Sequence, residues 1–177
     1  YKKLGQYHQA IDYFKKLIII NPSNIDLYLH LVEAYINLDK IALAVKALEI
    51  VIKLKPGYAE VHNNLANLYK KQGKIDLALI FYKNAIDLKP ELEEAHNNLG
   101  ITYMELGKVI DAINHYQIAT KLNNEFHFAY CNLGIAYKEI GDNVSAIKSF
   151  KKALEIQPDY AEPIHMLNIL NGFTSIA

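Results

Sequence analysis

The sequence predicts an all-α fold in which helix–turn–helix hairpins stack into an α-solenoid. Residues of the same kind recur every 34 positions along almost all of the 177 residues. Within each period the apolar residues are spaced by three and four, as on one face of a helix. A turn-forming residue separates two such stretches, so each period predicts a pair of helices.

The 34-residue period is visible in several kinds of residue at once. Prolines mark it at Pro22, Pro56, Pro90 and Pro158, with Asn124 where the remaining proline is due. A tyrosine column and a turn column have the same step: Tyr1, Tyr35, Tyr69, Tyr103 and Tyr137, and Gly5, Asp39, Gly73, Gly107 and Gly141. A largely aromatic column, interpreted as core packing, contains Phe14, Leu48, Tyr82, Tyr116 and Phe150. Coincident columns at one spacing indicate an internal repeat.

The elements are expected in the following order. Residues 1–24 contain the end of a first helix and a full second helix over about 7–20. A complete helix pair is expected in each of the ranges 25–58, 59–92, 93–126 and 127–160. In 59–92, Gly73 forms the turn between the helices and Pro90 ends the second helix. A lone helix over 161–171 caps the array, and 172–177 form a tail. Because 1–24 starts within a first helix, we expect that the chain was cut from a longer protein.

Each unit follows a pattern that resembles the tetratricopeptide repeat, a 34-residue helix–turn–helix unit. The pattern is, in order, a large residue, Leu, Gly, Tyr, Ala, Phe, Ala and Pro. The resemblance covers essentially the whole chain. Repeat 25–58 departs from it at Val32 and Asp39, where a small residue and Gly are usual. The resemblance implies a single right-handed superhelix over 1–177, with an inner concave wall made by the first helix of each repeat. It also implies that extended ligands bind along that wall.

Composition excludes several classes of function. The chain carries 19 basic residues, all of them Lys, and 19 acidic residues, so its formal net charge is zero. This balance, without a block of Lys, argues against a nucleic acid or a membrane surface as a partner. The apolar runs are too short to span a bilayer, and one Cys gives no sign of a disulfide-forming compartment. We therefore expect a cytoplasmic protein.

The sequence contains no catalytic or cofactor motif. A Gly-rich phosphate loop, a His-Glu-x-x-His helix and a nucleophile elbow are all missing from it. His62 and His96 occupy the same position in successive repeats and are interpreted as packing residues with one ring nitrogen in solvent. Cys131 is expected to be a reduced thiol in the groove wall, and it is not expected to act as a nucleophile because no base stands beside it in the sequence. We predict no enzyme activity, no metal and no cofactor.

The resemblance assigns positions two, five, six, nine, twelve and thirteen of each repeat to the inner wall. In 25–58 these positions hold Asp26, Leu29, His30, Glu33, Ile36 and Asn37. In the next three repeats position six holds Asn64, Asn98 and Asn132. A primary amide offers a donor and an acceptor, which match the backbone groups of an extended peptide. This ladder resembles the asparagine ladder in the tetratricopeptide superhelix of O-linked N-acetylglucosamine transferase, although the same amides could instead bridge neighbouring helices.

The predicted peptide-binding surface contains the ladder and other residues of the inner wall. Its members are Asn64, Asn98, Asn132, Asn63, Asn97, Asn67, Lys70, Ile101, Met104, Phe128, Cys131, Ile135 and Lys138. The apolar members toward the C-terminal end indicate a pocket for one anchoring side chain, unless the helix over 161–171 partly covers it. Position two is acidic at Asp26, Glu60 and Glu94, which argues against the cationic clamp with which chaperone-adaptor tetratricopeptide domains hold a terminal carboxylate.

These observations predict a noncatalytic protein–protein interaction scaffold that binds an extended peptide or an unstructured segment. An alternative is the substrate-targeting arm of a larger glycosyltransferase or methyltransferase, since arrays of this kind often precede such domains and 172–177 leaves the repeat pattern as a linker would. A third hypothesis is self-association through the partial repeat at 1–24, whose apolar edge could dock on another copy.

Overall fold

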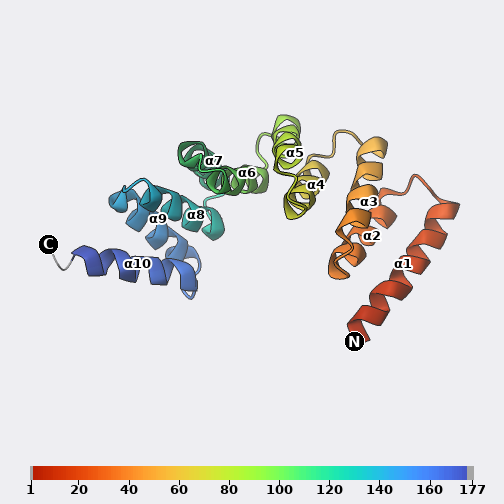
Figure 1. Ribbon diagram of the computed structural model, residues 1–177, viewed down its shortest axis with the longest axis horizontal. Helices are drawn as coiled ribbons and strands as arrows, with labels where there is room; N and C mark the ends of the chain where they lie inside the picture. Colours follow the sequence, from red (N-terminus) through yellow and green to blue (C-terminus); the bar gives the residue numbers. More distant parts are fainter. Residues whose placement is uncertain (1, 175–177) are drawn as a thin grey trace. The chain divides into compact units, whose positions relative to one another are not determined.

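The computed structural model describes residues 2–174, with the side chains of 6–170 and 172. Within that range the chain forms ten α-helices and no β-strand (Figure 1), as the predicted fold class requires. The helices are α1 Lys2–Ile20, α2 Ile25–Asn37, α3 Ile41–Leu54, α4 Ala59–Lys71, α5 Ile75–Leu88, α6 Glu93–Glu105, α7 Val109–Leu122, α8 His127–Glu139, α9 Asn143–Ile156 and α10 Ala161–Thr174. None of the helices in 2–174 has the length and apolar character that a membrane crossing requires.

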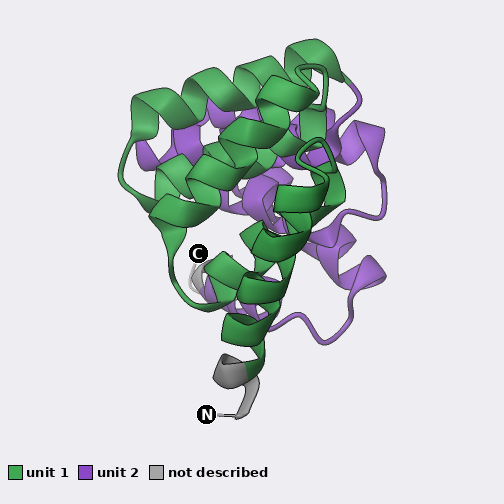
Figure 2. Cartoon of the chain, turned by 90° about the vertical axis from the view of Figure 1, so that its right-hand side faces the viewer, with its two compact units in different colours: residues 1–90 green, residues 91–177 purple. Residues whose placement is uncertain are grey.

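The helices form two compact units, which Figure 2 shows in different colours. The first unit, residues 1–90, contains α1 to α5, and the second, residues 91–177, contains α6 to α10. Inside each unit a helix packs mainly against the helices next to it in the chain, and α6 also contacts α8. Each unit therefore has the nearest-neighbour packing of a repeat protein. That both belong to one continuous array stays a prediction.

The turn between paired helices has the same geometry in all four hairpins. Asp39, Gly73, Gly107 and Gly141 have positive φ angles of 53°, 74°, 71° and 80°. The Lys74 amide donates to the Tyr69 carbonyl at 2.9 Å, and the Lys40 amide donates to the Tyr35 carbonyl at 2.8 Å. This pattern is the Schellman motif that ends helices. Asp39 closes its hairpin as the glycines do, because Asp is among the few side chains that tolerate the left-handed region.

Small residues on the first helix of a pair allow a close approach to the aromatic column on the second. A Cβ atom at Gly100 would lie 2.6 Å from Cε1 of Tyr116, and one at Gly134 would lie 2.6 Å from Cε1 of Phe150. Both rings are buried, and so is Tyr82 at the same position in 59–92. The aromatic column therefore packs in the core, as the sequence predicts.

The ends of the chain differ from the sequence expectations. α1 is one helix from Lys2 to Ile20, so the predicted turn at Gly5 is wrong. A Gly permits a turn without requiring one, so its place in the turn column does not by itself interrupt the helix. At the other end α10 runs to Thr174, beyond the predicted 161–171 and into the predicted tail. Residues 175–177 of that tail lie outside the described residues.

Candidate functional site

A cavity of about 350 Å³ opens between α2 and α4 in the first unit. It is lined by Leu29, Val32, Glu33, Ile36, Asn37, Leu48 and Asn64. Leu29, Glu33 and Ile36 are spaced by four and three residues, so they project from one face of α2. These three and Asn37 hold predicted inner-wall positions of 25–58, and Asn64 is the first member of the predicted ladder. We call this cavity the α2–α4 pocket.

Some polar side chains in and beside the α2–α4 pocket already have a hydrogen-bond partner within the protein, and others do not. Nδ2 of Asn37 donates to the backbone carbonyl of Glu33 at 2.9 Å, which holds this amide along its own helix. The side chains of Glu33 and Asn64 are exposed and have no hydrogen-bond or ion-pair partner among residues 6–170. At position two of α4, Glu60 accepts a hydrogen bond from Lys89 at 2.7 Å, and this bond holds the pKa of Glu60 below its ordinary value.

Contacts within the unit engage two of the other predicted residues of α4. Asn63 is buried, so the expectation that it faces the groove beside Asn64 is wrong. Asn63 and Asn64 point about 100° apart around α4, and of these two only Asn64 lines the α2–α4 pocket. Oδ1 of Asn67 accepts a hydrogen bond from the hydroxyl of Tyr82 on α5, and Lys70 is half-buried. Asn64, the ladder amide of the first unit, is thus exposed and without a partner among residues 6–170.

In the second unit the ladder asparagines lie on α6 and α8. Nδ2 of Asn132 donates to Oδ1 of Asn97 at 2.9 Å, and Asn97 is buried. Asn98 and Asn132 are half-buried. The bond joins the first helices of neighbouring repeats, which is the alternative that the sequence leaves open for these amides. The expectation that Asn97 faces a ligand is therefore wrong, and its amide holds Asn132 in place.

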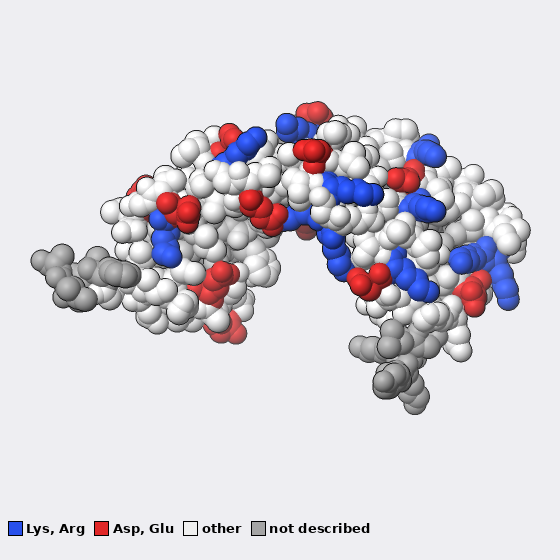
Figure 3. Space-filling model, in the orientation of Figure 1, with Lys and Arg blue, Asp and Glu red and all other residues white. Residues whose placement is uncertain are grey.

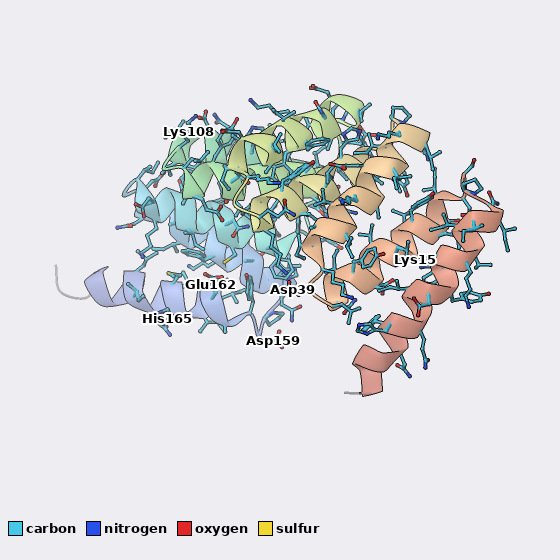
Figure 4. All side chains as sticks on the ribbon, turned by 45° about the vertical axis from the view of Figure 1, so that its right-hand side comes forward. Lys15, Asp39, Lys108, Asp159, Glu162 and His165 are labelled. Atoms are coloured by element: carbon cyan, nitrogen blue, oxygen red, sulfur yellow. The ribbon has the colours of Figure 1, made fainter. Side chains whose placement is uncertain are left out.

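The predicted apolar pocket toward the C-terminus is partly filled by α10. Cys131 is fully buried in a cluster with Phe150 and Leu170, and Ile135 packs against the same cluster. The expectation that Cys131 lines the groove is wrong, because Leu170 belongs to the helix that covers it. Its Sγ lies 3.7 Å from Oε2 of Glu162, which Figure 4 labels on α10. Burial, and then the charge of Glu162, raise the pKa of the Cys131 thiol to about 12, so nucleophilic thiolate is scarce at neutral pH.

The remaining predicted residues of the second unit are more open. Ile101 and Met104 are half-buried and pack against the core cluster that contains Tyr116. Phe128 is 50% exposed at the start of α8, and Lys138 is half-buried near the end of this helix. Of the predicted apolar anchors, Phe128 is the one whose side chain a ligand could reach most fully.

Sequence reasoning missed a contact between two histidines. Nδ1 of His96 on α6 lies 3.1 Å from Nδ1 of His115 on α7, so one nitrogen donates and the other accepts. Repeat alignment could have indicated this pair, because hairpin geometry brings these helices together.

In the first unit, Nε2 of His62 lies 2.9 Å from the Pro56 carbonyl, and its Nδ1 is buried without a partner. The expectation that one ring nitrogen of His62 reaches solvent is therefore wrong. Among residues 6–170 no three His, Cys, Asp or Glu side chains are grouped to hold a metal ion.

Sequence models of one repeat family match most of the chain. A model described as a tetratricopeptide repeat matches residues 2–68, and one described as a TPR repeat matches 66–107 and 102–141. A further tetratricopeptide repeat model matches 127–160. The chain is a tetratricopeptide repeat protein. The resemblance stated from the sequence is confirmed, and so is the α-solenoid fold class.

Solved structures show the same fold as this tetratricopeptide repeat protein. A crystal structure of MamA has 27% sequence identity and a TM-score of 0.78, and the match covers 91% of this chain and 94% of that one. YrrB, described as a TPR protein with an unusual peptide-binding site, has 19% identity and a TM-score of 0.74 over 94% of this chain and 86% of its own. The first TPR of Spaghetti (RPAP3), bound to the HSP90 peptide SRMEEVD, has 27% identity and a TM-score of 0.64, and the match covers 66% of this chain and 93% of that one. Comparison with curated protein sequences finds no match.

Proposed function

We propose that this tetratricopeptide repeat protein is a noncatalytic scaffold that binds an extended segment of another protein along the first helices of its repeats. The observation that carries the proposal is the α2–α4 pocket. Five residues that the repeat pattern assigns to the inner wall line this one cavity: Leu29, Glu33, Ile36, Asn37 and Asn64. The structurally similar first TPR of RPAP3 was solved with a peptide bound, which supports a peptide as the class of ligand.

The chemistry of the α2–α4 pocket suggests what the bound segment contains. Leu29 and Ile36 form an apolar wall for one aliphatic or aromatic side chain. The unpaired carboxylate of Glu33 favours a Lys or Arg beside that side chain. The amide of Asn64 can donate to and accept from the backbone of the segment, each bond contributing about 1 kcal/mol net. A strongly acidic segment is expected to bind poorly at this pocket.

Within the second unit, we propose that Asn98 and Asn132 make backbone contacts of the same kind with a bound segment. One N–H of the Asn132 side chain is donated to Asn97, and we propose the side-chain carbonyl oxygen of Asn132 as the acceptor for a peptide N–H. Phe128 would then add one apolar contact at the start of α8.

A display experiment tests the scaffold function. Random peptides are selected on the immobilised chain, and the dissociation constant of the best binder is measured for the parent and for variants. Ile36→Glu puts a charge on the pocket wall and is expected to weaken binding by at least about tenfold. Ile110→Glu, at another exposed isoleucine on α7, is the matched control.

The same pair of variants decides the outcome. Equal binding by Ile36→Glu and Ile110→Glu would place the peptide elsewhere and contradict the pocket assignment. If no peptide is selected at all, the proposal of a peptide scaffold fails. Asn64→Ala, with the exposed Asn114→Ala on α7 as control, then measures the backbone contact separately.

We also propose that α1 mediates self-association. Tyr13, Ile19 and Ile20 are exposed on this helix, and Tyr13 and Ile20 lie two turns apart on one face. Among the described helices α1 packs against α2, which leaves these side chains uncovered. An apolar face of this kind favours docking on a second copy.

A further inference from the structure

A second cavity lies within residues 91–177, where α7, α8 and α9 meet. Its volume is about 570 Å³. Pockets of roughly 300–1,000 Å³ are typical of ligand sites. Its floor on α8 is formed by Tyr130, Leu133 and Tyr137. None of the three holds an inner-wall position of 127–160, so this cavity is separate from the proposed peptide groove. We call it the α7–α9 cavity.

One wall of the α7–α9 cavity is basic. Lys148, Lys151 and Lys152 line it from α9, together with a single carboxylate, Glu155. Nζ of Lys152 donates to Oε2 of Glu155 at 2.8 Å. Lys148 and Lys151 are exposed, and no carboxylate among residues 6–170 pairs with either of them. Two ammonium groups therefore remain uncompensated at the edge of a cavity with an aromatic floor.

Hydrogen-bond donors dominate the site. The hydroxyl of Tyr137 accepts a bond from Nε2 of Gln117 at 2.7 Å, so its own proton is available to a ligand. A Lys side chain has donors and no acceptor. An ionised carboxylate has acceptors and no donor, so it matches this set of groups. The rings of Tyr130 and Tyr137 and the side chain of Leu133 provide apolar area beside these donors.

We propose that the α7–α9 cavity binds an acidic peptide segment in which an aromatic or leucine side chain stands between carboxylates. The apolar side chain lies on the floor formed by Tyr130, Leu133 and Tyr137, and the carboxylates pair with Lys148 and Lys151. The ligand charge is opposite to that expected at the α2–α4 pocket. A nucleic acid would need a longer basic stripe, whereas the net charge of the chain is zero and Figure 3 shows Lys and acidic residues interspersed on the face in view.

The probe is a fluorescein-labelled peptide, Asp-Glu-Phe-Asp-Glu, titrated with the whole chain and followed by fluorescence anisotropy. The double variant Lys148→Glu with Lys151→Glu is expected to weaken binding by at least about tenfold, since two pairs become repulsive. Lys83→Glu with Lys121→Glu is the matched control, because it changes the net charge equally at exposed Lys residues outside the cavity. The control is expected to bind within about twofold of the parent.

Further measurements distinguish this site from simple attraction between charges. A peptide with Gly in place of Phe is expected to bind at least about tenfold more weakly, because it lacks the side chain for the tyrosine floor. A peptide with Lys in place of each acidic residue should prefer the double variant over the parent. Carbodiimide coupling of peptide carboxylates to Lys148 or Lys151, located by mass spectrometry, would support the assignment. Absence of binding, equal loss in both double variants, or indifference to the Phe would overturn it.

Discussion

At the scale of single residues, the structure shows why small side chains occupy one column of the repeat. Gly134 on α8 faces Phe150 on α9, and a Cβ atom there would lie 2.6 Å from the ring. Phe150 is fully buried, so its ring cannot move aside without disturbing the cluster that includes Cys131 and Leu170. The close approach of α8 and α9 therefore depends on the absence of a Cβ atom at Gly134.

Gly134→Ala is expected to lower the free energy of unfolding by a net amount of about 1–2 kcal/mol. The overlap with Phe150 outweighs the gain of roughly 1 kcal/mol that Ala brings inside a helix. Gly57→Ala is the control, because nothing lies within 4 Å of a Cβ built at Gly57. Urea unfolding monitored by circular dichroism measures both. A Gly134→Ala chain as stable as the parent would show that the two helices can move apart freely.

The sequence predicts which side chains of the candidate site share a helix face better than it predicts which of them are buried. The spacing of Leu29, Glu33 and Ile36 is enough to place them on one side of α2, and the structure brings them to one cavity with Asn64. The burial of Asn63 and Asn97 is less visible in the sequence, since the inner wall is assigned from repeat positions and adjacent residues differ by about 100° in direction. Amide pairing such as that between Asn132 and Asn97 depends on the offset between helices.

At the scale of secondary-structure elements, α10 covers an apolar cluster formed by α8 and α9. Leu170 is 5% exposed and packs with Cys131 and Phe150, whereas Ile164 on the same helix is 40% exposed. Leu170→Ala is expected to cost about 2–3 kcal/mol of unfolding free energy, because it leaves a cavity in that cluster. Ile164→Ala is expected to cost less than about 1 kcal/mol. Equal effects in urea unfolding would mean that α10 does not pack through the face that contains Leu170.

The helices themselves could be predicted better than their ends. Repeated Gly and Asp at the turns and apolar spacing within each period predict the hairpins of α2 to α9, and the described turns have one geometry. The same rule fails at Gly5, where the chain stays helical from Lys2 to Ile20. A Gly permits a turn without requiring one, and a turn between two helices is stabilised mainly by their packing against each other.

At the scale of the whole molecule, each unit is built mainly from contacts between helices that follow one another in the chain. In such a protein stability is approximately the sum of repeat and neighbour terms. Among the described helices α1 packs mainly against α2, whereas α2 packs against both α1 and α3. The uncovered face of α1, with Tyr13, Ile19 and Ile20, follows from this arrangement within residues 1–90.

Self-association through α1 predicts a mass that rises with protein concentration. Ile19 and Ile20 are 82% and 79% exposed, so replacing both with Lys should leave the core intact while it makes docking on a second copy costly. We expect the Ile19→Lys and Ile20→Lys double variant to stay monomeric where the parent dimerises, a shift of at least about tenfold in dissociation constant. Val144→Lys is the control, because Val144 is equally exposed at 81% but lies on α9. Light scattering over a concentration series measures all three, and a parent chain that is monomeric throughout would contradict docking through this helix.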